Sequence, residues 1–248
     1  MMETKPRQKF SALYRELVRK VRQVGILGTL IRITSKLVQG ARGFISSAKR
    51  EKDPFDPKYG TDTSGFVGVG ALDIPHGQME HSMHYGPIWE DEFVRILDSL
   101  SIAYDDLVFV DLGSGKGRGL LLASLFPFKR IIGVELSQAL HDAAVRNIEI
   151  FKDSRQRCMQ IEAVHGDAST FQIPNEPTFL FLNNPFDDYV MRQAVFNIEA
   201  SLKLCPRRVL ILYVKPCYRS ALDGAKFLEK IRDTGRFVFY ESQPAHLL

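Results

Sequence analysis

The sequence predicts a doubly wound α/β fold with a mostly parallel sheet, because short apolar runs alternate with segments of helical length and period. Strands that are apolar along nearly their whole length are typical of a parallel sheet covered by helices on both faces. The alternation of such strands with helices predicts successive βαβ units. The five apolar runs lie at residues 107–112, 130–136, 160–164, 178–183 and 209–214.

Residues 1–50 are predicted to form a helical arm that precedes this fold. Apolar residues recur at three- and four-residue spacing in two stripes, from Phe10 to Val24 and from Leu27 to Val38, with glycines at the junction. This is the period of amphipathic helices. Each stripe needs a partner for its apolar face: the body of the protein, a second subunit or a membrane surface.

The formal charge of +4 is unevenly distributed along the chain. Residues 1–52 contain 13 Lys and Arg against 3 acidic residues, a charge of +10, whereas the remainder carries −6. This asymmetry favours a polyanionic partner for the arm, such as nucleic acid, an anionic membrane surface or a phosphorylated ligand. A solvated helical face that keeps the protein soluble is the alternative interpretation.

Residues 51–87 are predicted to be a linker or a lid loop. They are dense in Gly, Pro, Asp and Thr, which favour turns over periodic structure. The main domain is then expected over residues 88–248, beginning with a helix in 88–100 whose apolar residues share one face. At its end, residues 226–233 are predicted to form a short helix before a strand at 236–242, with a terminal hairpin as the alternative.

The composition bounds the class of protein. With 248 residues, 45% of them hydrophobic, the chain suits one large α/β core with an appendage. No apolar run approaches the roughly 18 residues that a membrane-spanning helix needs, and the sequence shows no signal-peptide pattern. We therefore expect a cytoplasmic protein, whose association with a membrane would be peripheral. Three cysteines without CxxC spacing, Cys158, Cys205 and Cys217, predict reduced thiols rather than disulfides or a zinc site.

The most informative stretch is FVDLGSGKGRGLLLAS at residues 109–124. A strand ends at Asp111, and Gly113, Gly115 and Gly117 follow at alternate positions before an apolar helix. Glycines of this kind let backbone approach a ligand closely. The spacing differs from the GxGxxG of dinucleotide sites, in which the third glycine comes three residues after the second.

Three further strand ends carry polar groups. Glu135 ends the second strand about 20 residues after the glycine loop, where an acidic side chain can accept hydrogen bonds from ribose hydroxyls. Asp167 follows the third strand, and the tetrapeptide Asn183-Asn184-Pro185-Phe186 follows the fourth. Because the carboxyl ends of parallel strands meet at one edge of the sheet, these groups are expected around a single site.

Taken together, these motifs resemble the class I, Rossmann-like S-adenosylmethionine (SAM) dependent methyltransferases. The resemblance covers roughly residues 85–240 and implies a seven-stranded-type sheet with SAM as cofactor. Asp111 would orient the loop and the methionine amino group, Glu135 would bind the ribose, and Asp167 with the backbone of Ala168 would bind adenine. The implied cofactor-binding residues are Asp111, Gly113, Ser114, Gly115, Gly117, Glu135, Asp167, Ala168 and Tyr85.

Other interpretations of the acidic residues remain open. Asp111 could cap a helix, Glu135 could belong to a dinucleotide site, and Asp167 could be a turn residue.

The tetrapeptide after the fourth strand resembles the Asn-Pro-Pro-Tyr/Phe motif of amino-group N-methyltransferases. The resemblance implies candidate catalytic residues Asn183, Pro185 and Phe186, with the asparagine oxygen holding the acceptor amine and the ring stacking on a planar acceptor. Asn184 departs from the motif, which has proline there. The alternative is that the two asparagines cap the following helix while Phe186 packs in the core.

The region before the first strand contributes further candidates. Tyr85-Gly86-Pro87 resembles the upstream loop of non-SET lysine methyltransferases, which implies a cofactor contact for Tyr85; a helix-entry residue packed on Trp89 or the core is the alternative. His76, His81 and His84 cluster with Glu80. A base or a substrate contact suits these histidines better than a metal site, because no regular helix is assured there.

The sequence therefore predicts a SAM-dependent methyltransferase that modifies an amino or amide nitrogen on a nucleobase or a protein side chain. A small-molecule methyltransferase is the alternative. A nicotinamide oxidoreductase is disfavoured by the glycine spacing. The alternative outside the enzymes is a non-catalytic SAM-fold binding module recruited through its basic arm.

Overall fold

The computed structural model describes residues 53–74 and 76–243. The described residues form one compact unit. The basic arm predicted for residues 1–50 lies outside the described residues. Within the described ranges, no helix combines the length and the apolar character that crossing a bilayer requires.

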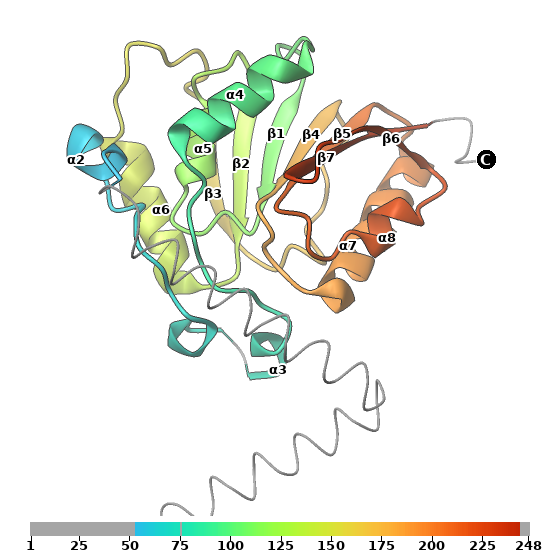
Figure 1. Cartoon of the computed structure of the whole chain (residues 1–248), viewed down its shortest axis with the longest axis horizontal. Coiled ribbons are helices and arrows are strands. Elements are labelled where there is room, and N and C mark those ends of the chain that lie inside the picture. The colour runs from blue at the N-terminus through green and yellow to red at the C-terminus, as the bar shows by residue number, and fades with distance from the viewer. Residues whose placement is uncertain (1–52, 75, 244–248) are drawn as a thin grey trace, which may run out of the picture. The chain divides into compact units, whose positions relative to one another are not determined.

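A seven-stranded sheet in the order β3-β2-β1-β4-β5-β7-β6 forms the centre of this unit (Figure 1). The five strands β1 to β5 are parallel, and β7 runs antiparallel between β5 and β6. The predicted doubly wound, mostly parallel sheet is confirmed. The strands are β1 Val108–Leu112, β2 Arg130–Glu135, β3 Ile161–His165, β4 Thr178–Leu182, β5 Val209–Val214, β6 Leu228–Asp233 and β7 Phe237–Ser242.

The strand order reverses direction at β1, which positions the site. From β1 the chain moves outward to β2 and β3, then returns to the other side of β1 for β4 and β5. Asp111 consequently pairs with Gly133 of β2 on one side and with Phe181 of β4 on the other. In open α/β sheets, ligands bind beyond the carboxyl ends of the strands at such a switch point.

Two hydrophobic clusters cover the two faces of the sheet. Along β1, Phe109 packs into a phenylalanine-rich cluster with the helices α4 and α5, while Val108 and Val110 face a second cluster that contains α7. This alternation follows from the two-residue period of a strand. The helices of the domain are α4 Glu90–Leu100, α5 Arg118–Ala123, α6 Gln138–Ile150, α7 Asp188–Leu204 and α8 Ser220–Asp223.

The segment predicted as a linker or lid belongs to the same compact unit as the sheet from residue 53 onward. It contains three short helical turns joined by loops: α2 Phe55–Tyr59, η1 Val69–Ala71 and α3 His76–Met79. Two isolated bridges, Val67 with Tyr85 and Ser82 with Phe186, tie it to itself and to the loop after β4.

The helix predicted at residues 226–233 is wrong, and the alternative hairpin is correct. Residues Leu228–Asp233 form the edge strand β6, which pairs with β7 across a turn at Gly235, whose φ is 74°. The apparent helical stripe is not buried as one face, since Phe227 is buried but Ile231 is 49% exposed. Strand β7 pairs with both β5 and β6. This pairing therefore outweighs the helical preference that the local spacing of apolar residues indicates.

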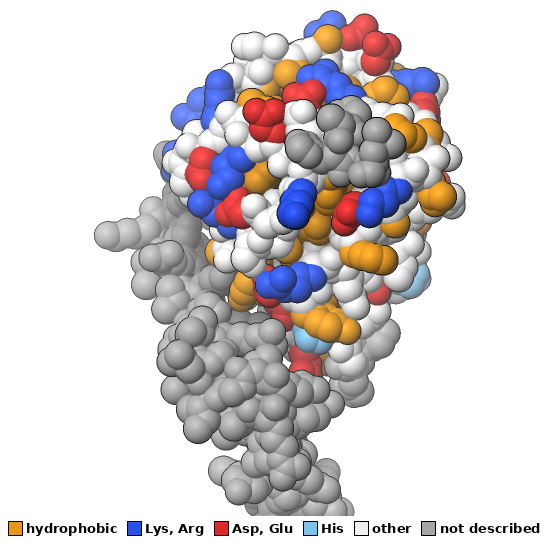
Figure 2. All heavy atoms as spheres, turned by 90° about the vertical axis from the view of Figure 1, so that its right-hand side faces the viewer, with side chains coloured by type: hydrophobic (Ala, Val, Ile, Leu, Met, Phe, Trp, Pro, Cys, Tyr) orange, Lys and Arg blue, Asp and Glu red, His pale blue; other side chains and the backbone are white. Residues whose placement is uncertain are grey.

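Alternating charges mark the surface near this hairpin. Figure 2 shows basic and acidic side chains interspersed over the face that it presents. Arg219 of the segment before α8 contacts Asp223 and Asp233, and Lys230 of β6 also contacts Asp223. Exposed pairs of this kind add little stability each, but charged residues on an edge strand discourage pairing with another chain.

Candidate functional site

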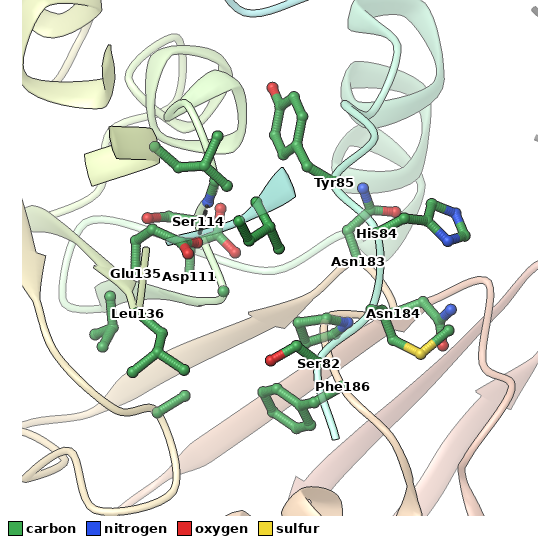
Figure 3. A pocket seen from close by; sticks show the side chains of 18 of the residues that line it. Ser82, His84, Tyr85, Asp111, Ser114, Glu135, Leu136, Asn183, Asn184 and Phe186 are labelled. Atoms are coloured by element: carbon green, nitrogen blue, oxygen red, sulfur yellow. Dashed lines mark hydrogen bonds between the residues drawn. The ribbon is translucent and has the colours of Figure 1, made fainter. Parts of the chain in front are cut away.

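A pocket lies at the carboxyl ends of β1, β2 and β4 and is walled by residues of the segment before α4 (Figure 3). In Figure 3, Asp111, Ser114 and Glu135 lie close together on one side, while Tyr85, His84 and Asn183 lie on the other. The pocket brings together nearly all residues predicted for the site: Tyr85, Asp111, Gly113, Ser114, Gly115, Glu135, Asp167, Ala168, Asn183, Pro185 and Phe186.

Two glycines of the loop after β1 are needed for close approach of other segments. Gly113 and Gly115 both have positive φ, which side chains rarely adopt. A Cβ at Gly113 would lie 2.4 Å from Pro185, and one at Gly115 would lie 2.2 Å from the Tyr85 ring. The loop after β4 that contains residues 183–186, called the acceptor loop below, and Tyr85 thus lie directly against the glycine loop.

Gly117 has a different place from the one predicted. It does not line the pocket; it is the N-cap of α5, and a Cβ there would lie 3.1 Å from Ala144 of α6. Its φ of 85° also requires a glycine. In this structure Gly117 therefore allows the turn into α5 and the close approach of α6.

Two buried carboxyl groups meet at the base of the pocket. Glu135 is 9% exposed and accepts hydrogen bonds from the backbone N–H groups of Gly115, at 2.7 Å, and Ser137, at 2.9 Å. Burial nevertheless raises the pKa of Glu135. Asp111 is 3% exposed, and burial together with the nearby Glu135 carboxyl raises the pKa of Asp111 well above its usual range.

Asp167 lines the pocket and also stabilises a turn. One oxygen accepts hydrogen bonds from the backbone N–H and the hydroxyl of Ser169, at 2.8 and 2.7 Å. The other accepts a hydrogen bond from Gln78 Nε2 at 2.8 Å. The turn interpretation and the pocket position therefore both hold for Asp167.

The asparagines after β4 do not cap α7. The N-cap is Asp187, whose Oδ1 accepts hydrogen bonds from the N–H groups of Tyr189 and Val190. Instead, Asn183 Nδ2 donates to the carbonyl of Gly86 at 3.1 Å.

Backbone geometry explains why Asn184 stands where the resembled motif has proline. The φ of Asn184 is 52°, in the left-handed region. Proline is locked near −65°, whereas asparagine tolerates the left-handed region better than most residues. The Asn184 side chain turns toward β5, where its Oδ1 accepts a hydrogen bond from the Tyr213 hydroxyl at 3.0 Å.

The segment around Ser82 runs alongside the acceptor loop. The N–H of Met83 donates to the carbonyl of Pro185 at 3.3 Å, and the N–H of Asp187 donates to the carbonyl of His81 at 2.9 Å. Phe186 lies beneath this segment, lines the pocket and is only 6% exposed. The predicted core-packing role of Phe186 is therefore seen together with its pocket position.

The histidines differ in their surroundings. His81 lies 3.0 Å from the Asp187 carboxylate, and its ring stacks on Tyr189 with centroids 4.4 Å apart. His84 packs on Phe66 at 4.5 Å, and burial, with Lys215 nearby, lowers the pKa of His84. Both histidines line the pocket. The side chain of His76 lies outside the described residues, and no metal-binding cluster occurs in the described part of the chain.

Arg118 is a charged residue of the pocket that sequence reasoning missed. It is the first residue of α5, lines the pocket and is only 2% exposed. Its partners are polar side chains of residues 53–64, far away in sequence. One feature of the sequence could have indicated its importance: Arg118 is a charged residue placed directly between the glycine loop and an apolar helix.

Comparison with known proteins places this geometry in a family. The family model described as "Histone methylation protein DOT1" matches residues 74–209, more than half of the chain. Comparison with curated proteins gives no match.

Several solved structures are similar to the chain. A predicted N6-adenine-specific DNA methylase from Listeria monocytogenes has 18% identity and a TM-score of 0.48, with 63% of this chain and 51% of that one covered. An RNA methyltransferase from Salinibacter ruber in complex with S-adenosyl-L-homocysteine has 20% identity and a TM-score of 0.41, with 63% and 92% covered. A TehB-like SAM-dependent methyltransferase from Corynebacterium glutamicum has 17% identity and a TM-score of 0.42, with 64% and 89% covered. The chain thus spans about half the length of the Listeria protein.

The extent of the family match decides the assignment. It begins in the segment that walls the pocket and ends at the start of β5, so it contains both the glycine loop and the acceptor loop. The chain belongs to the DOT1 family, whose model is described by histone methylation, and its domain has the Rossmann-like fold of SAM-dependent methyltransferases.

Proposed function

We propose that this enzyme N-methylates an amino group of a protein side chain, the ε-amine of a lysine, with SAM bound beyond the carboxyl ends of β1 and β2. The observation that carries the proposal is the juxtaposition, in one pocket, of a buried acidic pair and an asparagine whose amide is held by backbone.

The cofactor half of the pocket has the chemistry that SAM requires. Two buried polar atoms of its wall, Ser114 Oγ and Gln78 Oε1, have no hydrogen-bond partner among the described residues. Asp111 and Glu135 are neighbouring carboxyl groups whose ionisation is disfavoured by burial. A ligand that offers positive charge and hydroxyl donors would satisfy both features. SAM supplies a methyl group on a positively charged sulfonium.

Each residue has a role in this proposal. Glu135 binds the ribose hydroxyls with the lone pairs that its two backbone hydrogen bonds leave free, since each carboxylate oxygen accepts two. Asp111 binds the methionine amino group. Asp167 and the backbone of Ala168 bind adenine, and Tyr85 closes the wall over Gly115.

The acceptor half is built to hold an amine. Asn183 donates its amide N–H to Gly86, which directs its Oδ1 away from that carbonyl, and Lys215 Nζ approaches this oxygen at 3.4 Å. An oxygen that already attracts an ammonium group can accept the N–H of an incoming amine. Fixing the amine in this way directs its lone pair, and alignment supplies much of the acceleration in a displacement reaction.

Burial of Phe186 supports a linear side chain over a planar base as the acceptor. In the resembled motif the ring stacks on a planar acceptor, but here only 6% of Phe186 is exposed beneath the segment that pairs with it. A ring covered in this way offers little area for stacking, whereas a narrow alkyl amine needs none. The description of the family, histone methylation, agrees with a lysine acceptor.

A nucleobase amino group is the second candidate. Phe66 and Tyr189 are half-exposed; Tyr189 stacks on the pocket histidine His81, and Phe66 packs at a tilt on the pocket histidine His84. Aromatic and imidazole rings at a pocket rim suit stacking on unpaired bases. The +10 charge of residues 1–52 would attract nucleic acid.

Transfer from radiolabelled SAM to separate acceptors tests the proposal. We expect label on lysine of core histones or lysine-rich peptides and none on RNA or DNA. Asn183→Ala should reduce turnover at least ~100-fold with little change in affinity for S-adenosylhomocysteine, as for loss of one preorganised contact. Asn197→Ala is the matched control, because Asn197 bonds the carbonyl of Phe171. Label on nucleic acid alone would overturn the lysine proposal.

A further inference from the structure

The guanidinium of Arg118 is enclosed by residues 53–64, although it belongs to the helix that follows the glycine loop. Its Nε donates to Thr63 Oγ1 at 2.6 Å, and one terminal nitrogen donates to Ser64 Oγ at 2.9 Å. The other donates to the Asp53 carboxylate, and the ring of Phe55 lies 4.3 Å from the guanidinium carbon. With 2% of its surface exposed, Arg118 depends on this segment for nearly all its polar contacts.

The segment is organised around the same charge. Asp56 lies 3.6 Å from Arg118 and accepts hydrogen bonds from Thr61, Thr63 and Ser64. Burial alone would raise the pKa of Asp56, but the hydrogen bonds from Ser64, Thr63 and Thr61 lower it to about 2. Asp56 is therefore ionised at neutral pH and compensates the buried guanidinium. Removing a buried charge from its partner is strongly destabilising.

Thr63 joins this ion cluster to the cofactor pocket. Its hydroxyl accepts the hydrogen bond from Arg118, while its backbone carbonyl accepts one from the Tyr85 hydroxyl at 2.5 Å. The Tyr85 ring lies against Gly115, at the centre of the glycine loop. Loss of the Arg118 contacts would therefore release the backbone that holds the pocket wall in place.

A second polar tie links the segment to the same loop. Lys116 Nζ contacts Asp62 Oδ1 at 2.7 Å, and the Asn147 side chain bonds both the N–H and the carbonyl of Asp62. Apolar packing by residues 53–64 comes from Phe55 and Tyr59, whose rings lie against Phe151. The rest of the segment is held by polar contacts, and few buried apolar contacts are typical of parts that open locally.

We propose that Arg118 is a positioning residue for SAM: by docking residues 53–64 it holds Tyr85 over the glycine loop, so that cofactor binding and docking of this segment are one coupled event. The inference rests on SAM binding and is independent of which acceptor is methylated. By linkage, a cofactor that binds only the docked form must also protect the segment from opening.

The test compares Arg118→Lys with Arg207→Lys in the full chain. Arg207 is a partly buried arginine that bonds Ser201 and Cys205, far from this segment in sequence, and it serves as the matched control. Calorimetry measures the affinity for S-adenosylhomocysteine, and hydrogen exchange measures opening of residues 53–74 against residues 88–242. Thr63→Val is the second variant, because it removes the hydroxyl but keeps the carbonyl that Tyr85 uses.

We expect Arg118→Lys to weaken S-adenosylhomocysteine at least tenfold and to speed exchange in 53–74 while 88–242 stays protected. The KM for SAM should rise, with kcat at saturating SAM largely retained. Thr63→Val should show both effects more weakly, and Arg207→Lys neither. In the unsubstituted protein, saturating S-adenosylhomocysteine should slow exchange in 53–74.

Two results would overturn the inference. One is unchanged affinity in Arg118→Lys. The other is weaker affinity with normal exchange in 53–74, which would make Arg118 a direct ligand contact only. Failure of the lysine-acceptor proposal would leave both readouts unaffected, because neither depends on a methyl acceptor.

Discussion

Replacing Asp111 by asparagine should stabilise the cofactor-free protein and weaken cofactor binding at once. Asp111 is 3% exposed and lies beside Glu135, and burial and that neighbour raise its pKa. In the free protein its charge is therefore unfavourable. Asparagine keeps the shape of the side chain and removes the charge, so the repulsion disappears while the cationic groups of SAM lose a partner.

Removal of the buried charge of Asp111 should raise the Tm of the cofactor-free protein. For a protein of this size, each 1 kcal/mol gained raises the Tm by roughly 2 to 4 °C. Loss of a hydrogen bond to a charged group costs about 1.5 to 3 kcal/mol, which weakens the Kd roughly 10- to 150-fold.

The pH dependence gives this prediction its sign. Because the folded pKa of Asp111 lies above its unfolded value, the unsubstituted protein binds more protons when folded and loses stability as pH rises. Asparagine does not titrate, so the stability gain of Asp111→Asn should grow with pH. Thermal unfolding of the cofactor-free proteins between pH 5 and 8, with calorimetry using S-adenosylhomocysteine, measures both effects. A lower Tm at every pH, or an unchanged Kd, would refute the reasoning.

Three further predictions test other parts of the molecule. Glu135→Ala should weaken SAM by roughly 1.5 to 3 kcal/mol without unfolding the domain, and unchanged affinity by calorimetry would contradict the ribose assignment. Asn184→Pro should destabilise the protein in urea by more than about 1 kcal/mol relative to Asn184→Gly, since proline cannot adopt a φ of 52°; equal midpoints would contradict this. We propose that the basic arm recruits a polyanionic substrate or surface, so deleting residues 1–48 should leave SAM affinity intact but raise KM for that substrate, with a difference that shrinks as salt rises. If the full-length protein sediments with anionic vesicles and the truncated protein does not, the arm adsorbs to membranes instead. Aggregation of the truncated protein would contradict recruitment.

The sequence determined the features that depend on neighbouring residues along the chain. The parallel strands were predictable because full burial imposes a continuous apolar composition on each of them. Strand ends bring Asp111, Glu135, Asp167 and Asn183 to one edge of the sheet, so their meeting could be predicted without knowing any contact. The cofactor class followed from glycine spacing in the same local way.

Only the tertiary structure decided the features that depend on distant partners. Residues 228–233 carry a helical apolar pattern, yet pairing with β7 makes them a strand. Gly117 matches the motif, yet its neighbour is Ala144 of another helix rather than the pocket. Arg118 receives its partners from residues more than 50 positions earlier, and Asn184 owes its identity to a backbone angle. Periodicity along a chain reports burial and local turns, whereas charge compensation and close packing depend on which segments meet, and that is settled only when the whole domain folds.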